Sequence, residues 1–281
     1  MVVLVTGASG QLGQVLQAHA PKYEGLQFHF ATSAEADITS KENLEAVFTR
    51  LQPDFCINAA AYTAVDKAES EPEKAYLINV NGAKNLAEVC KKHTTTLLHI
   101  STDFVFDGSK KTPYTEGDAA NPQNIYGKTK REGEQEIKKI LPQHYIIRTS
   151  WLYSEYGNNF MKTMIRLGNE RDSLSVVNDQ AGTPTNANNL AEVLVQMILS
   201  GKKEYGIYHY SNEGVATWYD FAGKIFEANN ITVDLKPIAT ANYPTPAKRP
   251  AYSVMDKSKI KSVFGLDIPA WEEALKQLTK K

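Results

Sequence analysis

The stretch Thr6-Gly-Ala-Ser-Gly-Gln-Leu-Gly13 directly follows an apolar run, Val2–Val5, and opens a helical pattern from Gln11 to about Ala20. Its three glycines, Gly7, Gly10 and Gly13, have the spacing G-x-x-G-x-x-G. Glycine lets the backbone turn tightly and approach a pyrophosphate closely, and the N-terminus of the following helix faces the phosphates. Alone, the spacing also fits a plain turn. After the first strand of an alternating strand and helix pattern, it predicts a dinucleotide site.

That alternation runs through the first half of the chain. Short apolar runs predict strands at Val2–Val5, Leu26–Ala31, Phe55–Ala60, Thr96–Ser101 and Tyr145–Trp151. Amphipathic stretches predict helices at Gln11–Ala20, Lys41–Leu51 with Ser40 as N-cap, Glu73–His93 and Asn124–Ile140. Because the strand runs lack polar alternation, we expect a parallel sheet covered on both faces.

The pattern changes after Trp151. We expect helices at Asn158–Leu167, Asn189–Leu199, Trp218–Ala228 and from about Ala270 to Leu278, with strands at Leu174–Val177 and Ile207–Ser211. The sequence therefore predicts an α/β protein: a Rossmann-type doubly wound parallel sheet with a smaller C-terminal α/β substrate lobe. We expect residues 1–150 to form the NAD(P)-binding domain and residues 151–281 the substrate lobe, with some segments returning to the first domain.

Composition excludes several classes of protein. The 281 residues carry 31 basic and 32 acidic side chains, a formal net charge of −1. This balance leaves no basic surface typical of nucleic-acid or anionic-membrane binding, and no stretch is apolar over the roughly 18 residues of a membrane span. Cys56 and Cys90 form no CxxC pair, so we expect two buried, reduced thiols in a cytoplasmic protein.

The end of the second strand bears on the choice of cofactor. An acidic residue there favours NAD, because it binds the ribose hydroxyls and repels a 2′-phosphate. The sequence is Phe30-Ala-Thr-Ser33, with no acid until Glu35. Thr32 and Ser33 can hydrogen-bond a phosphate, although no arginine is nearby to neutralise it. We therefore favour NADPH and expect NADH to be acceptable.

A tyrosine and a lysine share one helix face in Tyr126-Gly-Lys-Thr-Lys130. The spacing itself is common by chance, and its position after the fourth strand gives it weight. A lysine cation about 5 Å from the phenol would lower the tyrosine pKa by about two units, towards neutrality. Thr102 ends the fourth strand, where its hydroxyl can donate to a carbonyl oxygen as negative charge develops. An ordinary strand-end turn is the alternative for Thr102 taken alone.

In this order, the glycine turn, the strand-end hydroxyl and the Tyr/Lys helix resemble the short-chain dehydrogenase/reductase superfamily, in its extended branch that acts on nucleotide-linked sugars. The likeness runs through the whole chain and is strongest to branch members that reduce a 4-ketosugar attached to dTDP. The matching segments are Gly10–Gly13, Ala59–Glu69, Ser101–Phe106, Arg148–Trp151, Gly157–Phe160, Asn178–Gln180 with Gly182–Thr185, and Tyr243–Pro250.

This resemblance implies a hydride from NADPH to the C4 ketone of dTDP-4-dehydro-L-rhamnose. Tyr126 would give the proton to the alkoxide, Lys130 would tune it and bind the nicotinamide ribose, and Thr102 would hydrogen-bond the ketone oxygen. Gly10, Gln11 and Leu12 match the family's pyrophosphate contacts, Asp37 and Ile38 match its adenosine end, and Ala61, Tyr62 and Thr63 match positions that line the cofactor. The residue patterns themselves add further cofactor candidates: Gly7 and Gly13 in the glycine turn, Thr32 and Ser33 after the second strand, and the small residues Ala59 and Ala60 at the end of the third.

Three positions match or suggest substrate contacts. Asp103 and Trp151 match residues that hold the substrate, with a core aromatic as the alternative for Trp151. Arg249 is a candidate for the diphosphate, because a guanidinium suits two phosphate oxygens; a surface ion pair is its alternative. Asp37 and Ile38 have a turn and a core residue as their alternatives.

The chain departs from some family members at a metal site. Those members form dimers through acidic residues that bind magnesium, one of them early in the first helix. Here the stretch Gly13-Gln-Val15 has no carboxylate, so we carry over neither the metal nor a homodimer. A dehydratase would need a second carboxylate after Asp103, where Phe104 stands. An epimerase of the branch and a non-catalytic regulatory subunit on the same fold remain the alternative functions.

Overall fold

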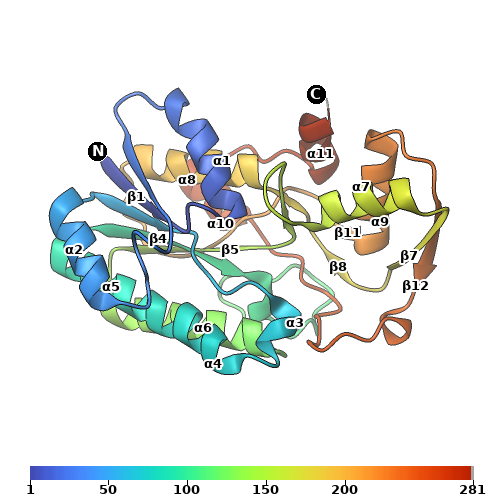
Figure 1. Ribbon diagram of the computed structural model, residues 1–281, viewed down its shortest axis with the longest axis horizontal. Coiled ribbons are helices and arrows are strands. Elements are labelled where there is room, and N and C mark those ends of the chain that lie inside the picture. Colours follow the sequence, from blue (N-terminus) through green and yellow to red (C-terminus); the bar gives the residue numbers. More distant parts are fainter. Residues whose placement is uncertain (280–281) are drawn as a thin grey trace.

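A six-stranded sheet forms the centre of the computed structural model, which describes residues 1–279 (Figure 1). Its strands lie in the order β10-β5-β4-β3-β1-β2, and every neighbouring pair is parallel. The strands are β1 Val2–Thr6, β2 Gln27–Ala31, β3 Phe55–Asn58, β4 Thr96–Thr102, β5 His144–Thr149 and β10 Gly206–His209. The predicted α/β class and doubly wound parallel sheet are confirmed.

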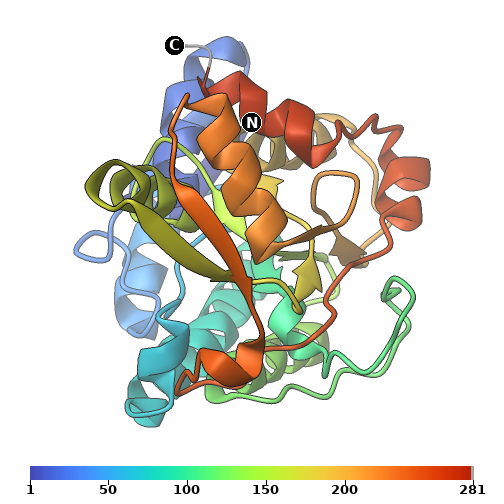
Figure 2. The same cartoon turned by 90° about the vertical axis from the view of Figure 1, so that its right-hand side faces the viewer.

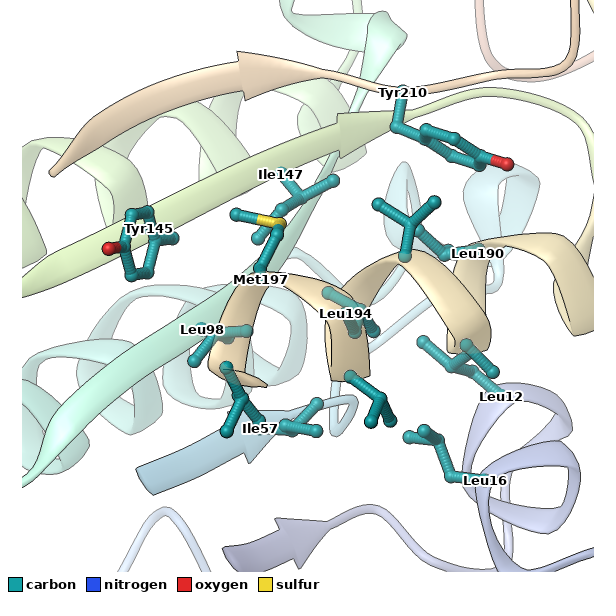
Figure 3. Packing of buried hydrophobic residues seen from close by; sticks show 14 of the residues in the cluster. Leu12, Leu16, Ile57, Leu98, Tyr145, Ile147, Leu190, Leu194, Met197 and Tyr210 are labelled. Carbon is teal, nitrogen blue, oxygen red and sulfur yellow. The ribbon is translucent and has the colours of Figure 1, made fainter. Parts of the chain in front are cut away.

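Helices cover both faces of this sheet (Figure 1). One layer holds α1 Gln11–His19, α8 Ala187–Leu199 and α10 Ser258–Phe264. The opposite layer holds α2 Lys41–Leu51, α5 Gly82–His93 and α6 Ile125–Ile140. Figure 3 shows Leu190, Leu194 and Met197 of α8 in one packed layer with side chains of the sheet that include Ile57, Leu98 and Ile147.

The strands are largely apolar because their two faces enter two different cores. Val3 and Val5 of β1 pack in the core under α1 and α8, whereas Leu4 packs under α2 and α5. Cys56 and Cys90 lie in the second of these cores as buried free thiols. A strand buried on both faces needs no polar alternation, which explains the apolar runs in the sequence.

A second cluster of elements lies beside the carboxyl end of the sheet (Figure 2). It contains α7 Phe160–Glu170, α9 Trp218–Ala228, α11 Trp271–Thr279 and the parallel pair β7 Ser173–Val177 with β12 Asp234–Ile238. Two-residue pairs join β6 Leu152–Tyr153 to β9 Thr185–Asn186 and β8 Ala181–Gly182 to β11 Ala216–Thr217. The short helical turns are η1 Ala20–Lys22, α3 Val65–Ala68, α4 Pro72–Tyr76, η3 Asp103–Val105 and η4 Thr240–Asn242.

The expected single helix over Glu73–His93 is interrupted. A π-helical turn, η2 Leu77–Asn81, separates α4 from α5. Its Asn79 side chain is buried and bonds both backbone groups of Tyr62, accepting from the amide at 2.9 Å and donating to the carbonyl at 3.1 Å. The wider turn thus points a polar residue at the loop after β3, which is a common use of π-bulges at functional sites.

Several sequence-based boundaries differ from the structure. The strand expected over Tyr145–Trp151 ends at Thr149, because Trp151 turns the chain with a φ of 46°. The strand β12 was missed, since it contains a proline and charged residues and pairs only at an edge. Within residues 1–279, no helix is both long enough and apolar enough to cross a membrane.

Candidate active site

The glycine turn packs tightly between β1 and the loop after β3. Gly7 has a φ of +73°, and a Cβ atom there would lie 2.6 Å from the backbone nitrogen of Ala60. A Cβ on Gly13 would lie 2.5 Å from the carbonyl oxygen of Gly7. Gly10 is the N-cap of α1 and has no side chain to cap it, so the N–H groups of the first turn are left for a ligand. Leu12 itself is buried in the core, so only its backbone faces this turn.

Gln11 links the glycine turn to the second lobe. Its amide nitrogen donates to the carbonyl oxygen of Leu152 at 3.1 Å. Its amide oxygen accepts from Asn159, the N-cap of α7, at 2.7 Å. The side chain of Gln11 therefore binds within the protein, and its backbone amide is the group that remains at the start of α1.

In the loop after β2, the Glu35 carboxylate binds the hydrogen-bond donors of Thr32, the first residue beyond the strand. The Glu35 carboxylate accepts from the backbone nitrogen of Thr32 at 2.9 Å and from its hydroxyl at 3.0 Å. These bonds, led by the backbone one, lower the pKa of Glu35, and the Arg50 guanidinium lowers it further. No arginine is close to Thr32 and Ser33 along the chain; Arg50 approaches this loop from α2 instead, which the sequence did not predict. Ser33 is exposed.

The remaining adenosine-end candidates make internal contacts. Asp37 accepts from the backbone nitrogen and hydroxyl of Thr39 at 2.9 and 2.7 Å. Ile38 is buried, and a Cβ on Gly82 of α5 would lie 2.7 Å from its Cδ1 atom. These are the contacts of a turn and a core residue.

Small residues continue the loop after β3. Ala59, Ala60 and Ala61 are partly exposed beside the glycine turn. Tyr62 is buried and donates its hydroxyl to Glu71 at 2.8 Å, while Thr63 is exposed.

Tyr126 lies in the first turn of α6, close to the end of β4. Asn124 caps this helix by accepting from the backbone nitrogen of Gly127 at 2.7 Å. The Tyr126 ring meets Phe104 edge-on, with ring centroids 5.7 Å apart. The Thr102 hydroxyl lies close enough to lower the pKa of Tyr126, so the strand end and the helix start form one site.

Burial dominates the titration of Tyr126 and Asp103. It raises the pKa of Tyr126 to about 12, with the Asp103 charge adding to the rise and Thr102 opposing it. It also raises the pKa of Asp103 to about 6, although the Ser253 and Thr102 side chains lower it. The Oδ1 atom of Asp103 accepts from Thr102 at 3.1 Å. Its Oδ2 atom has no hydrogen-bond partner within residues 1–279, so Ser253 is near without a well-formed bond.

Lys130 is buried one helical turn after Tyr126, on the same face of α6. Its Nζ atom donates to the carbonyl oxygen of Ile100 at 2.6 Å and lies 3.4 Å from Nε2 of His99. Burial lowers the pKa of Lys130 to about 8. The expected lowering of the Tyr126 pKa by Lys130 is wrong: burial raises that pKa, and the Lys130 ammonium is bound to the Ile100 carbonyl of β4.

Buried polar side chains extend from Lys130 across the sheet. His99 contacts Asn58 through its Nδ1 atom at 2.9 Å, and Asn58 accepts from the Thr6 hydroxyl at 2.8 Å. Burial holds the pKa of His99 well below its usual range, so this imidazole is neutral. The chain of contacts joins the carboxyl ends of β1 and β3, through His99 in the middle of β4, to the lysine.

A cavity of about 610 Å³ opens in the second lobe. Its walls include Phe160, Gln180, Trp218, Tyr243 and Arg249, but not Thr102, Tyr126 or Lys130. The reacting groups therefore do not form its wall. Its size and largely apolar wall suit the non-reacting part of a ligand.

Two candidate substrate residues border this region. Trp151 stacks on Trp218 with ring centroids 3.6 Å apart, which connects it to the cavity wall. Arg249 forms a two-pronged ion pair with Asp66, at 3.0 and 2.8 Å, which lowers the pKa of that carboxyl. The ion pair expected as the alternative for Arg249 is thus present, at the edge of the cavity.

Comparison with known proteins agrees with this arrangement. The family model described as "RmlD substrate binding domain" matches residues 1–281. A curated dTDP-4-dehydrorhamnose reductase of Aggregatibacter actinomycetemcomitans is 44% identical over 290 aligned residues, covering 98% of this chain and 97% of that protein. The chain belongs to the dTDP-4-dehydrorhamnose reductase family.

Solved structures of this reductase family superpose closely. The dTDP-4-dehydrorhamnose reductase of Clostridium acetobutylicum gives a TM-score of 0.94 at 44% identity, covering 99% of this chain and 98% of that one. The reductase of Bacillus anthracis, solved in complex with NADP, gives 0.94 at 41% identity with the same coverage.

Sequence reasoning missed several polar residues of this reductase-family site. Nothing in the sequence marks His99 as a neighbour of Lys130, because alternate strand residues point to opposite faces and the face is not known beforehand. The fold of the second lobe brings Trp218 onto Trp151 and places Gln180 where it accepts a hydrogen bond from the Trp218 indole. In the sequence, Glu35 stands too far beyond the strand end to be expected to act there, so its hydrogen bonds to Thr32 were not predicted. Among residues 1–279, no group of three or more His, Cys, Asp or Glu side chains could hold a metal ion.

Proposed function

We propose that this chain reduces the C4 ketone of dTDP-4-dehydro-L-rhamnose to dTDP-L-rhamnose with a hydride from NADPH, accepting NADH as well. The observation that carries the proposal is the grouping of Thr102, Tyr126 and Lys130 at the carboxyl edge of the sheet, next to a glycine turn with an uncapped helix. Relatives of this family are named for the same reaction, and one was solved with NADP.

The residues at the glycine turn fit a dinucleotide. A side chain at Gly7 or Gly13 would collide with the protein backbone. Glycine at both positions therefore keeps the turn tight, and the pyrophosphate of a ligand can approach its N–H groups closely. The N–H groups at Gln11, Leu12 and Gly13 would hold the pyrophosphate. The loops at Thr32, Ser33, Asp37 and Ile38 would hold the adenosine end, and Ala59–Thr63 would lie along the cofactor.

When bound, the nicotinamide supplies the hydride for the ketone carbon. Tyr126 supplies the proton, because its raised pKa keeps the phenol protonated at neutral pH and an alkoxide is more basic still. The Thr102 hydroxyl donates to the same oxygen as negative charge develops there. Both groups then act on one substrate oxygen from neighbouring elements.

Lys130 supplies the positive charge of the site. At neutral pH its ammonium is largely protonated, since its pKa is about 8. It would stabilise the Tyr126 phenolate after proton transfer and donate to the nicotinamide ribose. The Ile100 carbonyl and His99 keep its Nζ atom in place beforehand.

The second lobe would hold the rest of the substrate. Asp103, with one unpartnered oxygen, suits a sugar hydroxyl. Trp151 and the cavity beside it suit the sugar or base, and Arg249 would leave Asp66 for the diphosphate. In this proposal residues 1–150 bind the cofactor and residues 151–281 the substrate, in a cytoplasmic enzyme.

The test is to mix the protein with dTDP-4-dehydro-L-rhamnose and NADPH and follow the nicotinamide absorbance. Oxidation above the rate without protein is expected, with dTDP-L-rhamnose as product by chromatography. An unchanged absorbance would overturn the reductase assignment. Interconversion of sugar nucleotides without net oxidation would instead indicate an epimerase, and tight ligand binding without turnover a regulatory subunit.

A further inference from the structure

The loop after β2 lies directly beside the glycine turn. The backbone nitrogen of Ala8 donates to the carbonyl oxygen of Ala31, the last residue of β2, at 3.1 Å. Thr32 is therefore the first residue beyond the strand on the cofactor side. In Rossmann-type sites the adenosine ribose lies at this point, and its 2′ substituent meets the residues that follow β2.

Both donors of Thr32 are already bound by an anion. Its N–H and its hydroxyl point to the same oxygen of Glu35, at 2.9 and 3.0 Å. A 2′-phosphate would need these same two donors, and it cannot share them with a carboxylate because two anions at hydrogen-bond distance repel. A ribose 2′-hydroxyl faces no such conflict, since it can donate to the carboxylate.

We propose that Glu35 sets the cofactor preference of this enzyme by competing with the 2′-phosphate of NADPH for Thr32. NADPH binds only when the carboxylate leaves both donors, whereas NADH binds with Glu35 in place. The preference for NADPH is thereby reduced. This inference rests on the proposed function only in taking the edge at β1 and β2 as the cofactor site.

The electrostatic surroundings fit a competition of this kind. Arg50, in the last turn of α2, is near enough for its positive charge to lower the pKa of Glu35. Once Glu35 has moved, the same cation favours the phosphate. Because the loop is exposed, salt should screen the repulsion and narrow the difference between the two cofactors.

Calorimetric titration with 2′,5′-ADP and 5′-ADP tests the inference without turnover. Glu35→Gln keeps the shape of the side chain and removes its charge. We expect this variant to lower the dissociation constant for 2′,5′-ADP roughly tenfold at low salt and to change that for 5′-ADP less than about twofold. Glu24→Gln, an exposed change of equal charge before β2, is the matched control and should alter neither affinity.

A double variant separates the donors from the charge. Thr32→Val removes the hydroxyl, so in the Glu35→Gln background it should weaken 2′,5′-ADP and leave 5′-ADP unchanged. Equal effects of Glu35→Gln on both nucleotides, or none on either, would overturn the inference. Binding of neither nucleotide to any variant would overturn it together with the cofactor site. Intact nucleotide binding without sugar reduction would count only against the proposed reaction.

Discussion

Gly127 of α6 lies directly against the carbonyl oxygen of Phe104, and a Cβ atom at that glycine would lie only 2.1 Å from it. The contact sets how closely the helix carrying Tyr126 approaches the end of β4. Gly127→Ala must therefore push the first turn of α6 outward. We expect a loss of about 2 kcal/mol or more in the free energy of unfolding, although alanine favours helix more than glycine does.

Gly223→Ala in α9 is the matched control. A Cβ there would lie 3.7 Å from Leu235, an ordinary contact, so helix propensity should stabilise the protein by up to about 1 kcal/mol. Urea unfolding of both variants measures the two changes in the free energy of unfolding, which we expect to have opposite signs. A Gly127→Ala protein as stable and as active as the parent would show that α6 is not held by this contact.

Replacing the tyrosine hydroxyl should separate proton transfer from binding. Tyr126→Phe removes the proton donor and keeps the ring packed on Phe104, so turnover should fall by roughly 10² to 10⁴. The NADPH dissociation constant, measured by fluorescence, should stay within about threefold. Tyr76→Phe, on an exposed tyrosine, should leave turnover unchanged. Parallel losses of turnover and cofactor binding would make Tyr126 a structural residue instead.

Ketone reduction should decline in mildly alkaline solution. Because the pKa of Lys130 is about 8, its ammonium loses its charge as pH rises through that value, and the support for the Tyr126 phenolate goes with it. We expect kcat/KM to fall about tenfold per pH unit above this point. Lys130→Met should be slow and should lack this limb of the profile. A limb that persists in the variant would assign it to another group.

Asp103 should weaken the fold at neutral pH. Its pKa is raised from 3.8 to about 6, so the folded state holds the proton more tightly than the unfolded state. The resulting stability is complete below about pH 4 and is lost as pH rises through 6, a difference of roughly 3 kcal/mol. Asp103→Asn should thus stabilise the neutral protein, less any cost of an unpaired amide, while raising KM for the sugar nucleotide.

Asp107 is the matched control, because its carboxylate should stabilise the folded state at neutral pH where that of Asp103 destabilises it. Its carboxylate accepts from the backbone nitrogen and hydroxyl of Ser109 and from Tyr114, which holds its pKa below the usual range. Asp107→Asn should destabilise the neutral protein, and its effect should shrink in acid. Urea unfolding at both pH values compares the two. Destabilisation by Asp103→Asn at neutral pH would contradict the burial argument.

Local sequence signals predicted the elements of the sheet domain well. Lys41–Leu51 is a helix with Ser40 as its side-chain cap, as expected, and Asn124 caps α6. Such signals act within a few residues, so they need no knowledge of the fold. The π-turn at Asn79 and the edge strand β12 depend on partners far away in the chain, and no local pattern marks them.

The candidate site follows the same division. The sequence places Tyr126 and Lys130 on one helix face because their spacing determines it. It does not give the direction of the lysine side chain, which points to the Ile100 carbonyl, nor the stacking of Trp151 on Trp218. Charge effects depend on depth in the protein, which is why the expected pKa of Tyr126 had the wrong sign.

The place of β10 limits how this protein can be divided. Gly206–His209 is the edge strand of the sheet that β1 helps to form, yet it comes more than fifty residues after β5 in the chain. A fragment ending near residue 150 would lose that strand and the α8 layer, and would expose the backbone of β5 to pairing with other chains. Cofactor-binding fragments or chimaeras of this enzyme must therefore retain residues from both halves.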